Sequence, residues 1–171
     1  MIENQKIRLR APELSDLEII LKWENDESLW HLSQTVTPFS RIDIEQFILN
    51  NNKDIYTEKQ FRFMIETKQE KLVVGCIDLF DFDALHKRAG VGILIDEKYQ
   101  KKGLASQSLG LLIDYSKNHL QLHQLYCNIL QSNTDSFHLF KRKHFSEIGV
   151  KKDWICLNGI FQDEILLQLI L

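Results

Sequence analysis

The sequence predicts a single α/β domain that covers residues 1–171 and contains a mixed, largely antiparallel sheet of about seven strands flanked by about four helices. Segments of alternating and of helical period follow one another in the order β-α-α-β-β-β-α-β-α-β-β, which is typical of a mixed sheet with helices packed on it. Only two prolines and seven glycines occur, and no low-complexity run marks a linker. A chain of this length therefore forms one core.

The first third of the chain predicts one strand and two helices. Residues 6–11 alternate apolar and polar side chains, as a half-buried strand does. Residues 12–26 begin with a proline, carry acids in the first turn and repeat leucine and isoleucine at helical spacing, so they predict an amphipathic helix. Residues 41–51 predict a second helix, with Ser40 as its N-cap.

The middle of the chain changes to a strand pattern. Residues 60–67 alternate, and residues 71–82 and 88–96 are rich in β-branched side chains, as central strands are. The polar segment between the last two strands predicts a hairpin connection. A helix is then expected from Leu104 to Asn118.

The last third predicts three strands and one helix. Residues 123–130 predict a strand and residues 133–145 a helix with an asparagine near its cap. Residues 146–171 hold two strands that meet at Asn158 and Gly159, a pair that favours a tight hairpin turn.

Charge and composition exclude several classes of partner. The net charge is −3 and no basic stripe occurs, so neither nucleic acid nor an anionic membrane surface is expected to bind. No apolar stretch reaches the roughly 20 residues that span a bilayer. The N-terminal segment lacks the apolar core of a secretory signal, and three widely separated cysteines fit reduced thiols, so we expect a cytoplasmic location. No histidine or cysteine spacing indicates a metal site.

A lysine-rich loop, Gln100-Lys101-Lys102-Gly103-Leu104-Ala105, joins a predicted strand to a predicted helix. The first N–H groups of a helix have no intrahelical acceptor, and the helix dipole adds positive potential there. Gly103 permits the curl that turns successive amides toward an anion, and the small residues Ala105 and Ser106 leave the helix start open. Taken alone, these residues fit a solvated turn as well as an anion site.

The order of the elements decides between the two interpretations. In its place after the fourth strand, the loop resembles the pyrophosphate-binding loop of the GNAT acetyltransferases, [RQ]-x-x-G-x-[GA]. Residues 133–145 resemble the family's N-x-x-S-x-x-L-Y-x-K-x-G-F helix, with matches at Asn133, Ser136, Leu139 and Phe145. Three further segments are similar to the subgroup that contains the ribosomal-protein N-acetyltransferases and spermidine N-acetyltransferase: residues 7–29, 85–105 and 122–130.

The resemblance implies transfer of an acetyl group from acetyl-CoA to a primary amine. The amine, whose pKa is about 10 when free, must lose its proton. The thioester oxygen needs a backbone N–H donor, expected from Leu94 or Ile95. The residues that the resemblance assigns to coenzyme A are Ile93, Leu94, Ile95, Gln100, Lys101, Lys102, Gly103, Leu104, Ala105, Ser106 and Asn133.

The chain departs from the family where proton transfer is expected. The family's tyrosine acid falls at Phe140, and a frequent glutamate position falls at Gly90. Ser136 is one candidate for a hydrogen bond to the sulfur, although it equally fits a capping role. Other candidates for proton transfer or for a place beside the thioester are Cys127, Asp78, Asp81, Asp83 and His86. A non-catalytic acyl-CoA-binding or regulatory module on the same fold is therefore an alternative.

The acceptor is expected to bind near residues 24–41, where Trp30 and Phe39 either line its pocket or pack the second helix against the sheet. Acids occur at the start of this segment, and a neutral, aromatic stretch follows. Because spermidine enzymes carry an acidic cluster here, this composition weakens a polyamine assignment. A small amine, an amino sugar and a peptide N-terminus stay open. Many relatives are dimers, so a homodimer is one expectation.

Overall fold

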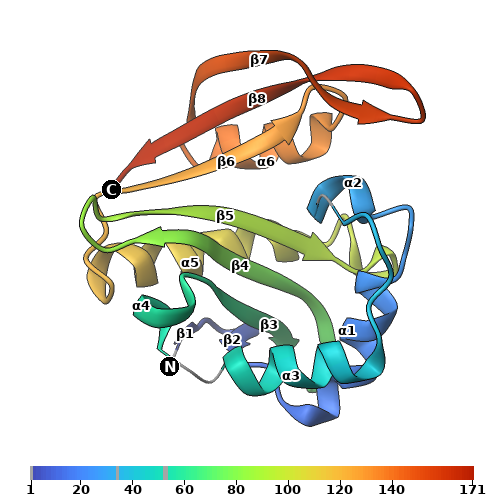
Figure 1. Cartoon of the computed structure of the whole chain (residues 1–171). Helices are drawn as coiled ribbons and strands as arrows, with labels where there is room; N and C mark the ends of the chain where they lie inside the picture. Colours follow the sequence, from blue (N-terminus) through green and yellow to red (C-terminus); the bar gives the residue numbers. More distant parts are fainter. Residues whose placement is uncertain (1, 34, 52–53) are drawn as a thin grey trace.

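The structure, a computed structural model, describes residues 2–33, 35–51 and 54–171 and has the mixed α/β architecture that the sequence predicts (Figure 1). Within this described part, one sheet has eight strands in the order β1-β2-β3-β4-β5-β6-β8-β7. The strands are β1 (Ile2–Glu3), β2 (Ile7–Arg10), β3 (Phe61–Thr67), β4 (Val73–Asp83), β5 (Arg88–Ile95), β6 (Gln124–Leu130), β7 (Ser146–Leu157) and β8 (Ile160–Ile170). The helices are η1 (Leu14–Asp16), α1 (Leu17–Glu24), α2 (Trp30–Ser33), α3 (Arg41–Asn51), α4 (Ile55–Glu58), η2 (Glu97–Tyr99), α5 (Leu104–Asn118) and α6 (Thr134–Arg142).

The predicted order of the seven strands and four longer helices is confirmed. The structure adds β1, which pairs with β2, and the one-turn helices α2 and α4. Such short elements carry too few residues to show a period. Two predicted N-caps are also confirmed: Ser40 Oγ accepts the Asp43 N–H before α3, and Asn133 Oδ1 accepts the Ser136 N–H before α6.

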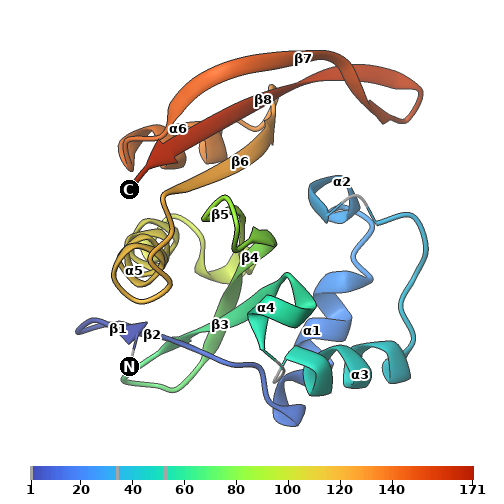
Figure 2. The ribbon, with the colours of Figure 1, turned by 60° about the vertical axis from the view of Figure 1, so that its left-hand side comes forward.

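Helices cover both faces of the sheet, with α5 and α6 on one face and α1, α2 and α3 on the other (Figure 2). Successive residues of β3 serve the two faces in turn. Ile65 packs in the core that contains Leu109 of α5, whereas Met64 packs in the core that contains Trp23 of α1 and Ile48 of α3. The sheet is therefore buried on both sides around its central strands.

The strands β5 and β6 form the parallel pair of the sheet, and they pair over only three residues each. Arg88–Gly90 face Gln124–Tyr126, after which the two strands diverge (Figure 1). Beyond this point β5 stays paired with β4, and β6 stays paired with β8. The divergence leaves backbone N–H and C=O groups of β5 and β6 facing an opening in the middle of the sheet.

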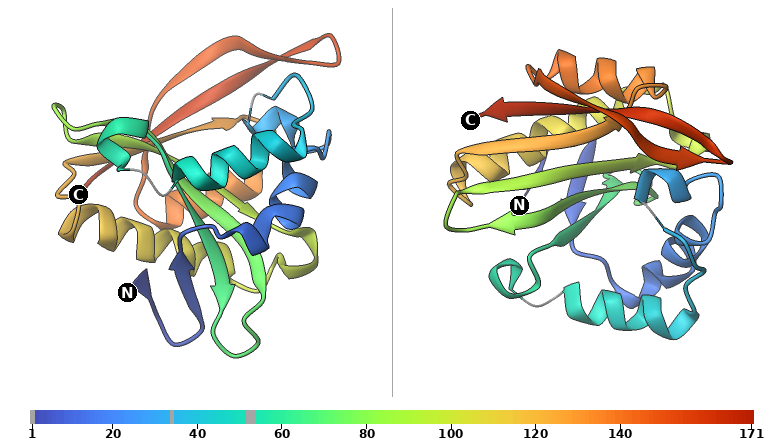
Figure 3. Two further views of the ribbon diagram at one scale, coloured as in Figure 1. Left: turned by 60° about the horizontal axis from the view of Figure 1, so that its bottom comes forward. Right: turned by 45° about the horizontal axis from the view of Figure 1, so that its top comes forward.

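The hairpin β7–β8 forms one edge of the sheet and extends past the neighbouring strands (Figure 3). Its turn residues Asn158 and Gly159 both have positive φ, 51° and 79°. This backbone is that of a type I′ turn, whose twist matches the twist of the two strands. The predicted Asn-Gly hairpin is thus confirmed.

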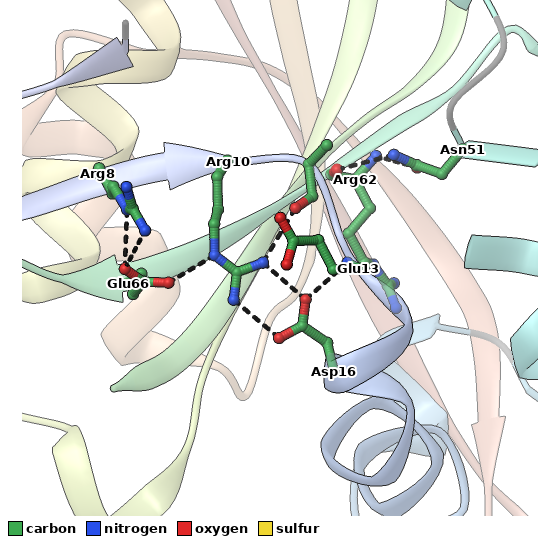
Figure 4. Close-up of polar contacts among 8 residues, drawn as sticks. Arg8, Arg10, Glu13, Asp16, Asn51, Arg62 and Glu66 are labelled. Carbon is green, nitrogen blue, oxygen red and sulfur yellow. Dashed lines mark hydrogen bonds and ion pairs between the residues drawn. The ribbon is translucent and has the colours of Figure 1, made fainter. Parts of the chain in front are cut away.

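A polar network fixes the start of the first helix (Figure 4). The Arg10 guanidinium donates to both carboxylate oxygens of Asp16 at 2.7 and 2.8 Å and to Glu66 at 2.6 Å, and Glu66 also pairs with Arg8. Burial raises the pKa of Asp16, but hydrogen bonds from Arg10 and from the Glu13 N–H outweigh it, so this pKa is lowered. The network ties β2 and β3 to η1, from which α1 continues directly.

Candidate functional site

A cavity of about 540 Å³ lies where β5 and β6 part. Residues from both halves of the sheet line it, together with residues of α1, the α2 region and α6. The lining residues used below are Glu24, Leu29, Leu32, Arg62, Cys76, Asp78, Phe80, Asp81, Gly92, Ile93, Leu94, Cys127, Asn128, Asn133, Ser136, Phe140 and Glu164. Its place at the divergence of two strands makes free backbone groups part of its surface.

The β5 wall has a defined backbone orientation. The Asp96 N–H donates to the Val74 carbonyl at 2.9 Å, and the β4–β5 register is regular from Ile95 to Gly90. Because hydrogen-bonded and non-hydrogen-bonded pairs alternate in an antiparallel ladder, the Leu94 backbone groups point to β4 and those of Ile93 and Ile95 point to the opening. The two residues expected for the thioester oxygen thus face opposite ways. The ladder favours Ile95 over Leu94 as the donor, although Leu94, and not Ile95, is among the described residues that line the cavity.

A glycine brings β4 close to this wall. A Cβ atom added to Gly75 would lie only 2.2 Å from the Leu94 carbonyl oxygen. Such an approach is far inside van der Waals contact, so only glycine fits at this position of β4. Gly75 therefore helps to fix the Leu94 carbonyl on the β4 side.

The lysine-rich loop lies beyond the end of β5 and opens α5. Lys101 and Gly103 have positive φ, 59° and 75°, so the chain curls twice before the helix starts at Leu104. The Gln100 side chain donates to the Ile95 carbonyl at 3.0 Å, which braces the loop against β5. The first N–H groups of α5 have no helical acceptor and stand at the positive end of the helix dipole. This geometry suits an anion such as a diphosphate.

Asp96 connects the same loop to the first helix. Its buried carboxylate accepts the Trp23 indole N–H at 3.1 Å and the Lys98 backbone N–H at 3.2 Å, and it pairs with Lys22 at 3.4 Å. Burial raises the pKa of Asp96, but these hydrogen bonds and the Lys22 charge outweigh it and lower this pKa. The carboxylate stays ionised and holds α1 against the start of the loop.

The wall formed by α6 carries the residues that the family resemblance assigns to the neighbourhood of the thioester sulfur. Asn133 caps the helix, and one turn later Ser136 and then Phe140 line the cavity. The Phe140 side chain is 3% exposed, and its ring meets the Phe145 ring edge to face at 5.0 Å. Phe140 thus occupies the tyrosine position of the family motif with a ring that has no proton to donate.

The other departure from the family also has a structural cause. A Cβ atom on Gly90 would lie 2.3 Å from the Phe80 ring, so this ring occupies the space of any side chain at position 90. Phe80 in turn meets the Tyr126 ring at 6.0 Å. The Tyr126 hydroxyl donates to Asp81 at 3.1 Å. Burial, with the Asp81 charge, raises the pKa of Tyr126 to about 12, so its hydroxyl stays protonated.

The cavity is acidic. Four carboxylates line it: Glu24, Asp78, Asp81 and Glu164. Among the described lining residues, Arg62 is the single cation. The Arg62 guanidinium donates to both oxygens of Asp78 at 2.9 and 2.8 Å and also bonds Glu24. Glu164 forms an ion pair with Lys151 of β7. The lining therefore suits a positively charged ligand.

Two buried thiols complete the lining. Burial raises the pKa of Cys76 to about 12, although the neighbouring Arg62 lowers it in part. Burial alone raises the pKa of Cys127. Both thiols stay protonated at neutral pH and do not serve as nucleophiles.

The structure brings together only part of the residues singled out in the sequence. Ile93, Leu94, Asn133 and Ser136 line the cavity, and so do the candidates Asp78, Asp81 and Cys127. Among the described lining residues, neither Trp30 nor Phe39 occurs, and neither do Asp83 and His86; Leu29 and Leu32 represent the α2 region instead. The Trp30 indole N–H donates to the Glu24 carbonyl at 2.8 Å, and the Phe39 backbone bonds Asn25.

Arg62 and Glu164 were not expected at the site. Arg62 lies between two phenylalanines of β3, whereas Glu164 follows Gln162 and Asp163 at the point where β8 becomes apolar. The isolated charge of Arg62 is a signal in the sequence, and Glu164 has no such signal. In the described part of the chain, no cluster of histidine, cysteine and carboxylate side chains is arranged to hold a metal ion. No helix in these residues has the length and apolar character needed to cross a membrane.

Comparison with known proteins agrees with this geometry. The family described as "Acetyltransferase (GNAT) domain" matches residues 6–146. Spermidine N(1)-acetyltransferase of Vibrio cholerae serotype O1 is 29% identical over 164 residues, which cover 94% of this chain and 90% of that protein. The crystal structure of the Vibrio cholerae spermidine N-acetyltransferase in complex with CoA and spermine superposes with a TM-score of 0.88 at 26% identity, covering 98% and 96% of the two chains. The [ribosomal protein uS5]-alanine N-acetyltransferase of Escherichia coli K12 is 30% identical over 114 residues, 64% of this chain and 57% of that protein.

Proposed function

The chain belongs to the GNAT acetyltransferase family and transfers an acetyl group from acetyl-CoA to a primary amine, and within this activity we propose that its acceptor is a small amine with at least two positive charges. The observation that carries the proposal is the lining of the cavity, in which four carboxylates face a single guanidinium. Attraction between an excess of carboxylates and a polycation is strong where the walls exclude water. The similarity to enzymes named for spermidine supports the same acceptor class.

We further propose where the cofactor binds. The diphosphate of coenzyme A lies at the curl of Lys101 and Gly103, against the first amides of α5. The pantetheine runs along β5, where backbone groups of Ile93 and Ile95 face the opening left by β6. Asn133 closes the other side from the start of α6. This places the thioester in the cavity, next to the acidic lining.

The proposed chemistry depends on position more than on a dedicated acid. Holding the neutral amine against the thioester supplies a large part of the rate. The Ile95 N–H stabilises the oxygen as it gains charge. Because Phe140 cannot donate a proton, the leaving thiolate takes up, by way of water, the proton that the attacking nitrogen loses, and the Ser136 hydroxyl in the same wall can donate a hydrogen bond to the sulfur.

The test measures coenzyme A release with a panel of acceptors under matched ionic strength. The panel contains spermidine, 1,4-diaminobutane, butylamine, glucosamine and a peptide with an N-terminal alanine. We expect kcat/KM to be at least about tenfold higher for spermidine than for butylamine in low salt, and the difference to shrink as salt screens the carboxylates. A kcat/KM for the peptide, for glucosamine or for butylamine that is higher than the value for spermidine would refute the proposed acceptor.

A further inference from the structure

Both the backbone and the side chain of Arg62 are held by contacts with α3. Its backbone N–H donates to Asn51 Oδ1 at 2.8 Å, and its carbonyl accepts the Asn51 amide at 3.2 Å (Figure 4). These two bonds replace the strand pairing that β3 lacks here, because β2 ends opposite Met64. The Phe47 ring of α3 lies 5.1 Å from the guanidinium carbon. The guanidinium therefore has a fixed position in the cavity wall.

Arg62 in turn fixes two acidic side chains that come from different elements. Asp78 projects from β4, opposite Gly92, where the missing side chain leaves it open to the cavity. Glu24 projects from the end of α1. The guanidinium bonds Asp78 through two parallel N–H groups and bonds Glu24 through a third. We call Arg62, Glu24 and Asp78 the Arg62 cluster.

The charge of this cluster does not balance. Burial lowers the pKa of Arg62, but the charges of Asp78 and Glu24 outweigh it, and this pKa lies well above its usual value. One fixed positive charge thus faces two carboxylates. The side chains of Glu24 and Asp78 are 17% and 27% exposed, and both line the cavity, so the net charge of −1 faces the ligand. A single ammonium group would neutralise the cluster.

The other two carboxylates of the lining differ from the Arg62 cluster in their surroundings. Lys151 neutralises Glu164, and Asp81, which accepts the uncharged Tyr126 hydroxyl, is exposed to solvent, where its charge is screened. An ammonium near a net negative charge is also held in its protonated form, because the charge raises its pKa. A protonated amine has no lone pair with which to attack the thioester. The Arg62 cluster thus suits the ammonium that does not react.

We propose that Arg62 is a positioning residue that holds Glu24 and Asp78 as a subsite for the second, non-reacting ammonium of the acceptor. This inference rests on the proposed function. The subsite selects acceptors with two cationic groups, and its fixed position selects the spacing between the reacting and the non-reacting amine. Arg62 contributes by fixing the two carboxylates, not by touching the reacting atoms.

The test compares 1,5-diaminopentane with pentylamine, which have equal length and differ in the second charge. Glu24→Gln and Asp78→Asn each remove one charge with little change of shape. We expect each to raise KM for the diamine at least about tenfold, with kcat, KM for acetyl-CoA and KM for pentylamine changed less than about threefold. Asp83→Asn is the matched control: it removes a carboxylate at the end of the same strand, outside the described cavity lining, and should behave as wild type.

Arg62→Lys tests positioning as distinct from charge. Lysine keeps the positive charge but cannot bond Asp78 through two parallel N–H groups. We expect the preference among diamines of three to six carbons to become weaker, with KM for acetyl-CoA unchanged. Should this variant fail to fold, the Glu24 and Asp78 variants still decide the question.

Two results would overturn the inference. In Glu24→Gln or Asp78→Asn, the first such result is an equal rise of KM for the diamine and for pentylamine. The second is a fall of kcat with both KM values unchanged. Either result would show that the cluster does not recognise the second charge. In either case a wild-type preference for polyamines would leave the proposed function standing. A wild-type enzyme that does not favour the diamine over pentylamine would refute both.

Discussion

Replacing Phe140 by tyrosine tests how much the missing acid costs the reaction. The Phe140 side chain is 3% exposed and lines the cavity on the same helical face as Ser136, four residues earlier. A new hydroxyl at the ring edge either meets a partner there or is buried without one. An unpartnered buried hydroxyl costs about 1–3 kcal/mol of stability. Because the ring borders a cavity with a serine hydroxyl in the same wall, we expect Phe140→Tyr to cost at most about 1 kcal/mol.

The expected gain in rate is also bounded. A positioned acid or base typically contributes a factor of about 10² to 10⁴. A thiol has a pKa of about 8.5, far below that of an alcohol, so the thiolate leaves without full protonation and the gain lies below this range. We expect kcat of Phe140→Tyr to rise about tenfold, which corresponds to about 1.4 kcal/mol.

The assay is steady-state coenzyme A release at saturating acetyl-CoA with the best acceptor, together with urea unfolding. Phe140→Leu is the control, since it alters the ring without adding a donor. In Phe140→Tyr the rate should also fall above a pH of about 10, where a tyrosine ionises. A folded variant whose kcat and pH profile match wild type would refute the argument, because protonation of the leaving group would then not limit the rate.

Two further variants test the loop and the first-helix network. Gly103→Val forces a β-branched residue to φ +75°, which costs roughly 1–2 kcal/mol or displaces the loop amides, although an added Cβ atom has space, its contact being the Gln107 side chain at 3.9 Å. Calorimetric titration should therefore show at least about tenfold weaker binding of acetyl-CoA. Gly103→Asn, in which asparagine tolerates this backbone, should bind acetyl-CoA as wild type does. Asp16 has a lowered pKa in the folded state, so its contribution is present above a pH of about 4 and is lost as the pH falls through its folded value. Asp16→Asn should lose about 2 kcal/mol of unfolding free energy at pH 7 and little at pH 2, as measured by urea unfolding; equal losses at both pH values would contradict the role of the charge.

The long elements could be predicted from the sequence because their side-chain period decides them locally. The helix Leu104–Asn118 has the bounds expected from its apolar pattern, and the hairpin turn at Asn158 and Gly159 follows from backbone preference. The first helix differs: α1 starts at Leu17, after a 3₁₀ turn, because Asp16 is engaged by the Arg10 side chain of β2. Such a contact between distant residues leaves no local pattern.

The site divides in the same way. The lysine-rich loop, Asn133 and Ser136 belong to contiguous motifs, so they could be predicted from the sequence. The acidic lining of the cavity could not be predicted in this way. Glu24, Asp78 and Glu164 come from α1, β4 and β8, and they line one cavity only because β5 diverges from β6. The acids within residues 24–41 therefore make up only part of the negative charge of the cavity. The homodimer and the cytoplasmic location stay predictions.

In the proposed function, separation of charges lets a chain of net charge −3 bind two substrates of opposite sign. An anionic cofactor and a cationic acceptor attract each other in solution, and an evenly charged site would weaken the binding of one of them. In this fold the positive potential lies at the start of α5, outside the described cavity lining, where Lys101, Lys102 and the helix dipole coincide. The negative potential lies inside the cavity, where β4, α1 and β8 place carboxylates. In the proposed arrangement the thioester and the amine meet where the two regions adjoin, and the divergence of two strands supplies both the space and the backbone donors for the reaction.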